Sequence, residues 1–574
     1  MKKHKHNAPT KISSRYLLLL AVFVCMLGAI IARLGYLHVV NHDFLSKQGD
    51  ARTKRTVKIA AYRGMIRDRH GESLAISTQV DSVWVNPQTF DISNPQIREL
   101  ARLLNMPVKK ISAKVRHYAK LQKEFVYLRR HVAPELGKKI SALQLPGVYL
   151  QTEYRRYYPA GEVTAQLLGI TNVDDRGVDG LELAYNSWLA GKPGKKIIER
   201  DRLGREVEHL SSVAEVQPGN DLILSIDARL QYLAYKALKN AVIQHKAVSG
   251  SAVVLDVRTG EILAMVNNPS FNPNTRENNS DKTYYRNVAV TDAFEPGSVL
   301  KTFGMLSVLE RIKLQPDTMV DTSPGYLKLP GGVVRDIHYR GVLSLGAILK
   351  ESSNIGLTKL VMQIKPRDLV DTYNRLGFGF VTGSGFPGEG SGYVTNPSEN
   401  QVFVQATMSF GYAVSVTPLQ LAQAYAIIGA GGVKRPVSFL KVASVAAGER
   451  VVNANVARQM LDLLAVAGDH EQSKARVDGY RVAGKTGTAH KASKHGYDRK
   501  KYRSLFGGLA PAINPRVAIV VAIDEPRAGD YYGGQVAAPV FSRIASGALR
   551  LMKISPDLLD THGVHIAASN GSRD

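Results

Sequence analysis

Phe294-Glu-Pro-Gly-Ser298-Val-Leu-Lys301 is the stretch that decides how the fold of this sequence is interpreted. Its Pro-Gly pair is typical of a turn, and the mainly apolar residues that follow, as far as Glu310, predict a helix directly after that turn. Ser298 and Lys301 therefore share one face of the first helical turn. A lysine can accept the proton of a serine hydroxyl where burial or a neighbouring cation lowers its pKa. The stretch predicts a serine nucleophile at a helix N-terminus, whose positive field favours developing negative charge.

A Ser-x-x-Lys pair alone is weak evidence, because a second one occurs at 438–441. Two further motifs follow Ser298 in the chain, Ser352-Ser-Asn354 and Lys485-Thr-Gly487. Ser-x-Asn also recurs at 398–400, whereas Lys-Thr-Gly occurs once. Three motifs in this order are the signature of the penicillin-recognising serine acyltransferases. The order disfavours both a chance coincidence of tripeptides and the alternative nucleophile in the second Ser-x-x-Lys pair.

Strand patterns occur at both ends of the region that holds these motifs. Residues 251–266 have the pattern of a hairpin, and residues 504–510 and 516–523 form a second strand pair. Helical sequence lies between them, and Asp227 is a suitable N-cap for a helix over 229–243. A sheet built from both ends of a helical region predicts an α+β domain.

The sequence before this region has a different character. Residues 63–76 predict a strand, a turn and a second strand, and helical spacing surrounds Ile111–Leu121. Frequent glycine over 151–210 predicts an extended, irregular chain, which ends at a turn signal over 218–221. We expect a strand over 222–226 to follow it. The expected organisation is a tail at 1–15, a transmembrane anchor at 16–40, an extended α+β pedestal at 41–220, an α+β catalytic domain at 221–553 and a C-terminal tail at 554–574.

The N-terminus predicts a membrane anchor. Residues 1–15 carry five Lys or Arg and no acidic residue, and residues 16–32 are uncharged and mostly apolar. This length is at the lower limit for a bilayer, and Arg33 can reach the far interface so that residues 34–40 complete the span. A cleaved signal peptide is the alternative that fits the same pattern. For an uncleaved anchor, the positive-inside rule places residues 1–15 in the cytoplasm and the large remainder outside.

Composition limits the class of protein. The chain has 574 residues, which at about 150 residues per domain suggests a few domains. Its formal net charge of +26 favours a polyanionic partner such as nucleic acid, an anionic membrane surface or an acidic substrate. An exported body makes nucleic acid a poor choice, so we expect a membrane partner and no nucleic acid. Cys25 is the single cysteine, which excludes an intrachain disulfide and a Cys-based metal site; we expect no metal and no organic cofactor.

Residues 249–301 closely resemble the class B penicillin-binding proteins, in particular the septal peptidoglycan transpeptidases of FtsI type. The further segments that carry the resemblance are Arg63–Arg69, Tyr158–Gly161, Gly169–Val173, Asp201–Arg205, Ser409–Tyr412 and Ser415–Gln420. The similarity runs from the anchor to about residue 550. It departs from the family at His70, where Asn is common, and in the basic loop 489–502. The resemblance implies the penicillin-binding transpeptidase fold, an antiparallel sheet flanked by helices, after the pedestal and a single membrane helix.

The resemblance also implies roles for individual residues. For catalysis, the resemblance implies Ser298 as the nucleophile and Lys301 as its base. It implies that Ser352 relays the proton to the leaving amine and that Asn354 holds Lys301 and the substrate amide. It implies that Lys485 attracts the substrate carboxylate and helps keep Lys301 neutral. For substrate binding, it implies Thr486, Gly487 and Thr488. The backbone N–H groups of Thr488 and Ser298 are then expected to form the oxyanion hole.

The implied activity is D,D-transpeptidation: a serine acyl-enzyme forms with release of the terminal D-Ala, and a neighbouring stem peptide resolves it into a cross-link. The expected partners are stem peptides, the lipid-linked precursor, β-lactams, and division-machinery proteins that include a polytopic glycosyltransferase. The expected location is the inner membrane at the division septum, with the catalytic domain in the periplasm. A D,D-carboxypeptidase, an elongation-type class B transpeptidase, a serine β-lactamase and a non-catalytic scaffold are the alternatives.

Overall fold

The structure is a computed structural model, and it describes residues 14–200, 206–275, 282–315, 317–493 and 496–557. The chain forms two compact units that do not follow its linear order. Unit 1 comprises Met1–Ala61, Gln79–Glu153 and Lys192–Gln217, and unit 2 comprises Tyr62–Thr78, Tyr154–Gly191 and Pro218–Asp574. Two segments of the expected pedestal thus belong to the same unit as the catalytic region. The domain limits given above stay predictions.

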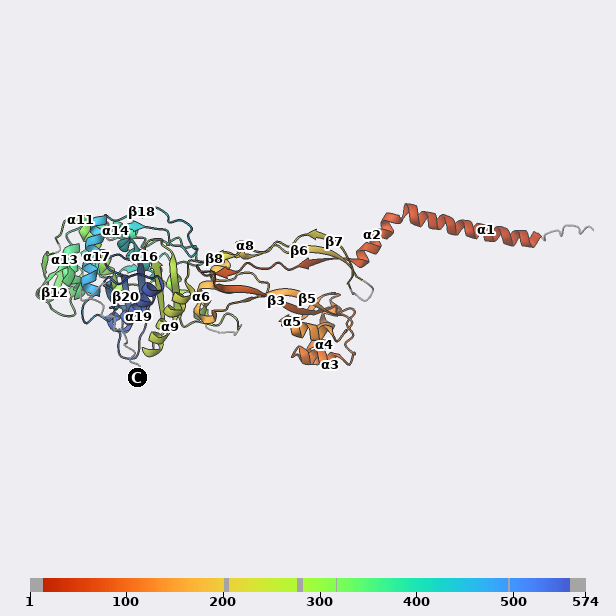
Figure 1. The fold of residues 1–574 in the computed structure, drawn as a ribbon, viewed down its shortest axis with the longest axis horizontal. Coiled ribbons are helices and arrows are strands. Elements are labelled where there is room, and N and C mark those ends of the chain that lie inside the picture. The colour runs from red at the N-terminus through yellow and green to blue at the C-terminus, as the bar shows by residue number, and fades with distance from the viewer. Residues whose placement is uncertain (1–13, 201–205, 276–281, 316, 494–495, 558–574) are drawn as a thin grey trace, which may run out of the picture. The chain divides into compact units, whose positions relative to one another are not determined.

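Unit 1 begins with the apolar N-terminal helix (Figure 1). Helix α1 (Ser14–Gly35) continues as a π-helical turn over Tyr36–Val40. Within the described residues, this is the one helix long and apolar enough to cross a membrane. It fits a single-pass inner-membrane protein by its length and composition.

A three-stranded antiparallel sheet in unit 1 follows helix α2 (His42–Thr53). Its order is β1 (Lys54–Ile59), β6 (Gly194–Arg200) and β7 (Glu206–Ala214). The expectation of irregular chain over 151–210 is wrong for the part that forms β6 and the start of β7. Their regular structure comes from pairing with each other and with β1, far away in the sequence.

The other part of unit 1 is a small α+β lobe. Its helices are α3 (Ile97–Leu103), α4 (Val108–Lys120) and α5 (Pro134–Ser141). Their buried residues share one core with the end of β3 (Ser73–Val85) and with β4 (Val126–Val132). Helix α4 confirms the helical spacing seen around Ile111–Leu121.

The central sheet of unit 2 has five antiparallel strands, in the order β10-β9-β21-β20-β19. The strands are β9 (Ser249–Asp256), β10 (Ile262–Asn268), β19 (Ala483–Ser493), β20 (Gly496–Ala510) and β21 (Val517–Asp524). Strands β9 and β10 come from the expected hairpin, and strands β20 and β21 correspond to the expected second strand pair. The sheet is therefore built from both ends of the domain. This confirms the α+β class.

Helices cover both faces of this sheet (Figure 1). Ala252 and Val254 of β9 share a core with α9 (Ala228–Gln244) and α19 (Ala538–Leu551). Val253 and Leu255, which point to the opposite face, share a core with α11 (Lys301–Arg311) and α16 (Pro418–Gly429). The alternation is the period of two that a strand imposes, and burial on both faces explains the apolar runs in its sequence.

Local signals set the limits of several elements. Asp227 caps α9 by accepting hydrogen bonds from the backbone N–H groups of Arg229 and Leu230, as predicted. The strand expected over 222–226 is shorter, β8 (Leu222–Ile223). The remaining elements are β2 (Ile66–Arg67), β5 (Val148–Tyr157), α6 (Ala165–Leu168), α7 (Gly180–Ala184), α8 (Asn186–Leu189), α10 (Val288–Thr291), β11 (Met319–Asp321), β12 (Tyr326–Leu329), β13 (Gly332–Arg335), β14 (Val342–Ser344), α12 (Leu345–Lys350), α13 (Asn354–Val361), α14 (Pro366–Leu376), β15 (Tyr393–Val394), α15 (Val402–Ser409), β16 (Val414–Ser415), β17 (Val433–Lys434), β18 (Glu449–Arg450), α17 (Ala454–Gly468) and α18 (Gly533–Val536), with 3-10 turns at Gly161–Val163, Lys282–Tyr285 and Gly297–Leu300.

Candidate active site

The predicted nucleophile lies in a tight turn against the edge of the central sheet. Residues Gly297–Leu300 form a 3-10 turn, and α11 begins at Lys301. Gly297 has a φ of +57°, and a Cβ there would approach Ala489 Cβ at 3.0 Å and the carbonyl oxygen of Thr488 at 3.2 Å. Glycine is required both by this conformation and by this close approach. The turn therefore places Ser298, which is half-buried, beside β19.

Lys301 is fully buried behind this turn. Its Nζ donates hydrogen bonds to the backbone oxygen of Ser352 and, at 3.1 Å, to Ser352 Oγ. Burial lowers the pKa of Lys301 well below its ordinary value, the positive charge of Lys485 lowers it further, and Asp336 acts in the opposite direction. A lysine with a lowered pKa is the group that can accept the serine proton.

The Ser352-Ser-Asn354 segment is held by a carboxylate that the motifs did not indicate. Asp336 accepts hydrogen bonds from Ser353 Oγ and from the backbone N–H groups of Asn354 and Ile355. A carboxylate at the first turn of α13 is favoured by the helix dipole. Nothing in the sequence beside Asp336 links it to a helix 18 residues further on, so sequence reasoning missed it.

The same segment fixes the side chains of Ser352 and Asn354. Ser352 has a φ of +57°, the left-handed region, in the residue pair before α13. Asn354 Nδ2 donates to the backbone oxygen of Arg335 at 2.8 Å. The role expected for Asn354 on Lys301 and on the substrate amide stays a prediction.

Lys485 and the two residues after it lie on β19, the outer strand of the sheet. Lys485 is buried, and burial lowers its pKa to about 7. Its Nζ donates to the backbone oxygen and to Oγ1 of Thr486, both at 3.2 Å. A Cβ on Gly487 would lie 2.6 Å from Val299 Cγ2. In this structure glycine is thus needed for the approach of the nucleophile turn to β19.

Thr488 lies next along the strand and faces a glycine turn. Its Oγ1 accepts a hydrogen bond from the backbone N–H of Gly533 at 3.0 Å. The close approach of Gly297 to the Thr488 carbonyl brings the backbone of Thr488 beside the Ser298 turn. An oxyanion hole made from these two backbones is compatible with this arrangement and stays a prediction.

Glu295 is a second residue that the motif reading missed. Its Oε1 accepts a hydrogen bond from the backbone N–H of Ala413 at 2.8 Å and one from the Tyr497 hydroxyl at 3.1 Å. Glu295 thus ties the start of the Ser298 turn to the 409–416 segment and to β20. The Phe-Glu-Pro-Gly-Ser sequence contained this residue but no signal for its partners.

The competing motifs lie in other environments. Ser438 Oγ donates to the backbone oxygen of Leu440 at 2.8 Å and accepts from its N–H at 3.0 Å, while Lys441 Nζ donates to the backbone oxygen of Arg69. In the segment 398–400, the N–H of Ser398 donates to Gln401 Oε1. Over the part of the chain that the structure describes, no group of three or more His, Cys, Asp or Glu side chains is placed to hold a metal ion.

The fold and the three motifs are those of a penicillin-binding transpeptidase. The family model of the penicillin-binding protein transpeptidase domain matches residues 250–546, and that of the penicillin-binding protein dimerisation domain matches residues 58–224. The peptidoglycan D,D-transpeptidase FtsI of Escherichia coli (strain K12) is 42% identical over 97% of this chain and 95% of its own. The probable peptidoglycan D,D-transpeptidase PbpC of Pseudomonas aeruginosa is 41% identical over 95% of this chain and 96% of its own.

Solved structures agree with these relatives. A peptidoglycan synthetase from Bifidobacterium adolescentis is 26% identical with a TM-score of 0.69, over 88% of this chain and 98% of that chain. The transpeptidase domain of Burkholderia pseudomallei penicillin-binding protein 3 is 40% identical with a TM-score of 0.53, over 58% of this chain and 98% of that chain. The chain belongs to the penicillin-binding proteins, as a class B member of FtsI type, which confirms the resemblance and the fold predicted from the sequence.

Proposed function

We propose that the chain is a septal peptidoglycan D,D-transpeptidase that works through an acyl-enzyme on Ser298. The activity is that of the FtsI relatives, which align with it over nearly its whole length. The observation that carries the mechanism is the environment of Lys301, which lies three residues after Ser298. Lys301 is fully buried, its Nζ donates a hydrogen bond to Ser352 Oγ, and its pKa is lowered.

The acylation step follows from these positions. Ser298 Oγ attacks the carbonyl carbon of the penultimate D-Ala of a stem peptide, and Lys301 takes the hydroxyl proton. The N–H groups of Ser298 and Thr488 stabilise the oxyanion. Lys301 returns this hydroxyl proton through Ser352 to the leaving amine, the D-Ala–D-Ala amide bond breaks, and the terminal D-Ala departs. Lys485 pairs with the substrate carboxylate through Coulomb attraction in a buried setting.

Deacylation restores the serine and forms the cross-link. The amine of a neighbouring stem peptide attacks the acyl ester and loses a proton to Lys301. The ester bond to Ser298 Oγ breaks, and Lys301 returns that proton to Ser298 Oγ. Thr486 and Gly487 lie on β19, the strand along which the peptide binds, and Asn354 holds the substrate amide. β-Lactams resemble D-Ala–D-Ala and stop the sequence at the acyl stage.

The experiment measures D-Ala release and cross-linked product from a pentapeptide donor, with and without an amine acceptor, for the full-length protein in detergent. We expect a cross-linked product that depends on the acceptor. Release of D-Ala into water at the same rate, without product, would instead support a D,D-carboxypeptidase. The Ser298→Ala variant should yield neither D-Ala nor product.

The location and partners belong to the same proposal. Residues 1–15 lie in the cytoplasm, the span is formed by residues 16–40, and the pedestal and catalytic domains lie in the periplasm at the septum. Glycan polymerisation comes from a polytopic glycosyltransferase of the division machinery. A fluorescent fusion that gathers at midcell during division supports a septal role, and one spread along the side wall would support the elongation type.

A further inference from the structure

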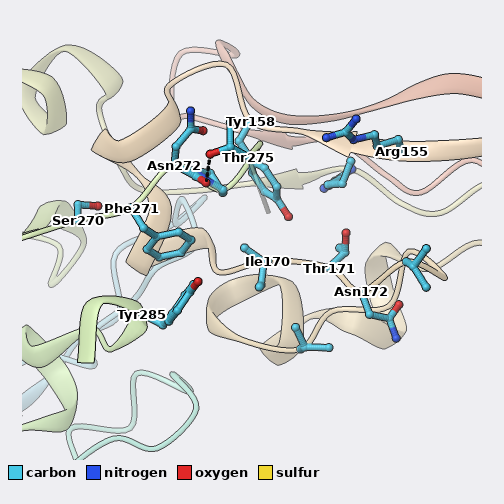
Figure 2. A pocket seen from close by; sticks show the side chains of 14 residues that line it. Arg155, Tyr158, Ile170, Thr171, Asn172, Ser270, Phe271, Asn272, Thr275 and Tyr285 are labelled. Carbon is cyan, nitrogen blue, oxygen red and sulfur yellow. Dashed lines mark hydrogen bonds between the residues drawn. The ribbon is translucent and has the colours of Figure 1, made fainter. Parts of the chain in front are cut away.

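A pocket of about 620 Å³ in unit 2 lies outside the active site (Figure 2). Its lining includes Arg155, Phe271 and Tyr285, and none of the residues placed in the active site lines it. Arg155 Nη2 already donates to the carbonyl of Asn274 at 2.8 Å. The contacts that fix the nucleophile lie instead in the packing of its own turn.

The nucleophile turn lies against segment 411–416, which comes from a distant part of the sequence. The backbone N–H of Gly297 donates to the carbonyl of Gly411 at 3.2 Å. Phe294 and Val416 exchange two backbone hydrogen bonds, at 3.0 and 2.9 Å. A Cβ on Gly411 would lie 2.0 Å from the carbonyl oxygen of Gly297, so glycine is needed for this close approach. The place of the nucleophile turn therefore depends on the shape of segment 411–416.

Ala413, in the middle of this segment, has a strained backbone conformation. Its φ is +57°, in the left-handed region that residues with a Cβ rarely adopt. Two side chains hold the residue there. Its backbone N–H donates to Glu295 Oε1 at 2.8 Å, and its carbonyl accepts a hydrogen bond from Thr395 Oγ1. Such a conformation persists only where its surroundings fix it, so Glu295 helps to keep the segment in the shape on which the nucleophile turn rests.

Glu295 makes its contacts with one oxygen only. The residue is half-buried and lies three positions before Ser298. Its Oε1 accepts from the N–H of Ala413 and, at 3.1 Å, from the hydroxyl of Tyr497. Its Oε2 is buried and has no hydrogen-bond partner within the described part of the chain. The contact with Ala413 therefore requires one acceptor at the end of a side chain of this length, and an amide oxygen would meet that requirement.

We propose that Glu295 is a positioning residue for acylation, which holds Ala413 and thereby fixes the place of the Ser298 hydroxyl. Glu295 acts through the backbone of segment 411–416, not on the reacting atoms. A reacting group displaced by about 1 Å can lose about 10²-fold in rate, so loss of the contact should slow the chemical step more than it weakens substrate binding. The inference rests on the proposed acyl-enzyme at Ser298.

The test compares two substitutions at Glu295 in the full-length protein in detergent. Glu295→Asp keeps the charge but shortens the side chain by one methylene, and Glu295→Gln loses the charge but keeps the length and the acceptor. Stopped-flow acylation, with fluorescent penicillin raised to saturation, separates the dissociation constant of the first complex from the rate constant of acylation. For Glu295→Asp we expect a rate constant at least about ten-fold lower with an unchanged dissociation constant. For Glu295→Gln we expect a rate constant close to that of the unmodified protein.

The same two variants separate side-chain length from charge. A Glu295→Gln rate constant as low as that of Glu295→Asp, or an unchanged rate constant in Glu295→Asp, would overturn the proposal. Burial, Lys485 and Asp336 shift the pKa of Lys301, and Glu295→Asp alters none of them. The pH at which the rate falls as Lys301 becomes protonated should therefore be the same in this variant. A shifted value would mean that Glu295 acts on the base instead.

A change at Ala413 tests the route through the backbone. Glycine adopts a positive φ readily, so Ala413→Gly relieves the conformation that Glu295 has to hold. Shortening Glu295 should then cost less rate in the Ala413→Gly background than in the unmodified chain, and equal costs would contradict the role through Ala413. If circular dichroism shows that Glu295→Asp does not fold, the rate constant of Glu295→Gln still decides. A value near that of the unmodified protein supports the proposal, and one as low as expected for Glu295→Asp overturns it.

Glu389→Asp is the matched control. Glu389 is also half-buried, and its Oε1 also accepts from a backbone N–H and a hydroxyl, both of Thr382. This variant should acylate at the unmodified rate, and a loss as large as in Glu295→Asp would overturn the proposal. Ser298→Ala separates this inference from the proposed function. Labelling of Ser298→Ala would refute the acyl-enzyme itself, whereas an unlabelled Ser298→Ala beside a normal Glu295→Asp refutes only the role of Glu295.

Discussion

Lys301 Nζ lies 3.1 Å from Ser352 Oγ, although the two residues are 51 positions apart in the sequence. The contact joins the first residue of α11 to the residue pair that precedes α13, so two of the three motifs meet at one nitrogen atom. Because Lys301 is fully buried there, its charged form is disfavoured, and the nearby charge of Lys485 disfavours it more. The relationship supports the proposal that Lys301 is the base of the site.

The identity of the nucleophile can be tested by substitution. Ser298→Ala should abolish covalent labelling by a fluorescent penicillin, read out on a denaturing gel, because no other serine occupies the turn before Lys301. Ser438→Ala is the matched control and should label normally, since the Ser438 hydroxyl is bonded to the backbone of Leu440. Labelling that persists in Ser298→Ala would refute the assignment.

Removal of the base should slow acylation and spare the fold. Lys301→Ala should reduce the second-order rate constant of acylation at least ~10²-fold, the usual size of a lost general base. Stopped-flow or quenched-flow labelling measures this rate, and circular dichroism checks the fold. A Lys301→Ala protein that acylates at an unchanged rate would show that another group takes the serine proton.

Asp336 should influence the pH dependence of acylation through its effect on the pKa of Lys301. Its negative charge raises the pKa of Lys301, so Asp336→Asn should lower that pKa further. The form of Lys301 proposed to accept the serine proton is the neutral amine, which predominates above its pKa. In the plot of acylation rate against pH, the acid limb, where the rate falls as Lys301 becomes protonated, should therefore move to lower pH. A limb that stays in place or moves to higher pH would contradict this role of Asp336.

The penicillin adduct should be long-lived. Hydrolysis needs a base placed to activate water, and the sequence offers no separate motif for one. Intact-protein mass spectrometry after rapid removal of free penicillin should show the adduct for many minutes. Return of the free mass within seconds would indicate a β-lactamase instead.

A carboxylate at the end of the central sheet should make stability depend on acid pH. Burial opposes ionisation of Glu525, but hydrogen bonds from Lys491 and Arg527 outweigh it and lower its pKa from 4.5 to about 2. The contribution is therefore complete above about pH 4.5 and is lost as the pH falls towards 2. Lys491→Met should lower the melting temperature at neutral pH, with a deficit that shrinks across this interval.

The control for this prediction is Lys236→Met, a substitution of an exposed lysine on α9. Its melting temperature should follow that of the unmodified protein at every pH. A Lys491→Met deficit that is the same at pH 2.5 and pH 7 would mean that the ion pair with Glu525 does not cause it.

The sequence by itself determined the elements whose signals are local. The hairpin around Thr259-Gly260 and the N-cap at Asp227 depend on residues within a few positions of one another, and the structure has both. The ordered motifs also identified the family, because their residue types and sequence order are enough for that. Each of these predictions rests on short-range geometry or on a specific residue pattern.

The tertiary structure alone decided which distant groups meet. Asp336 reaches the first turn of α13 through a β-hairpin, and β6 becomes regular by pairing with β1 about 140 positions earlier. No local pattern encodes such pairings, because the hydrogen-bond partner of a strand or a helix end lies elsewhere in the chain. The same holds for Lys301. Its lowered pKa comes from burial and from the charge of Lys485, which is far away in the sequence, and both depend on how the chain packs.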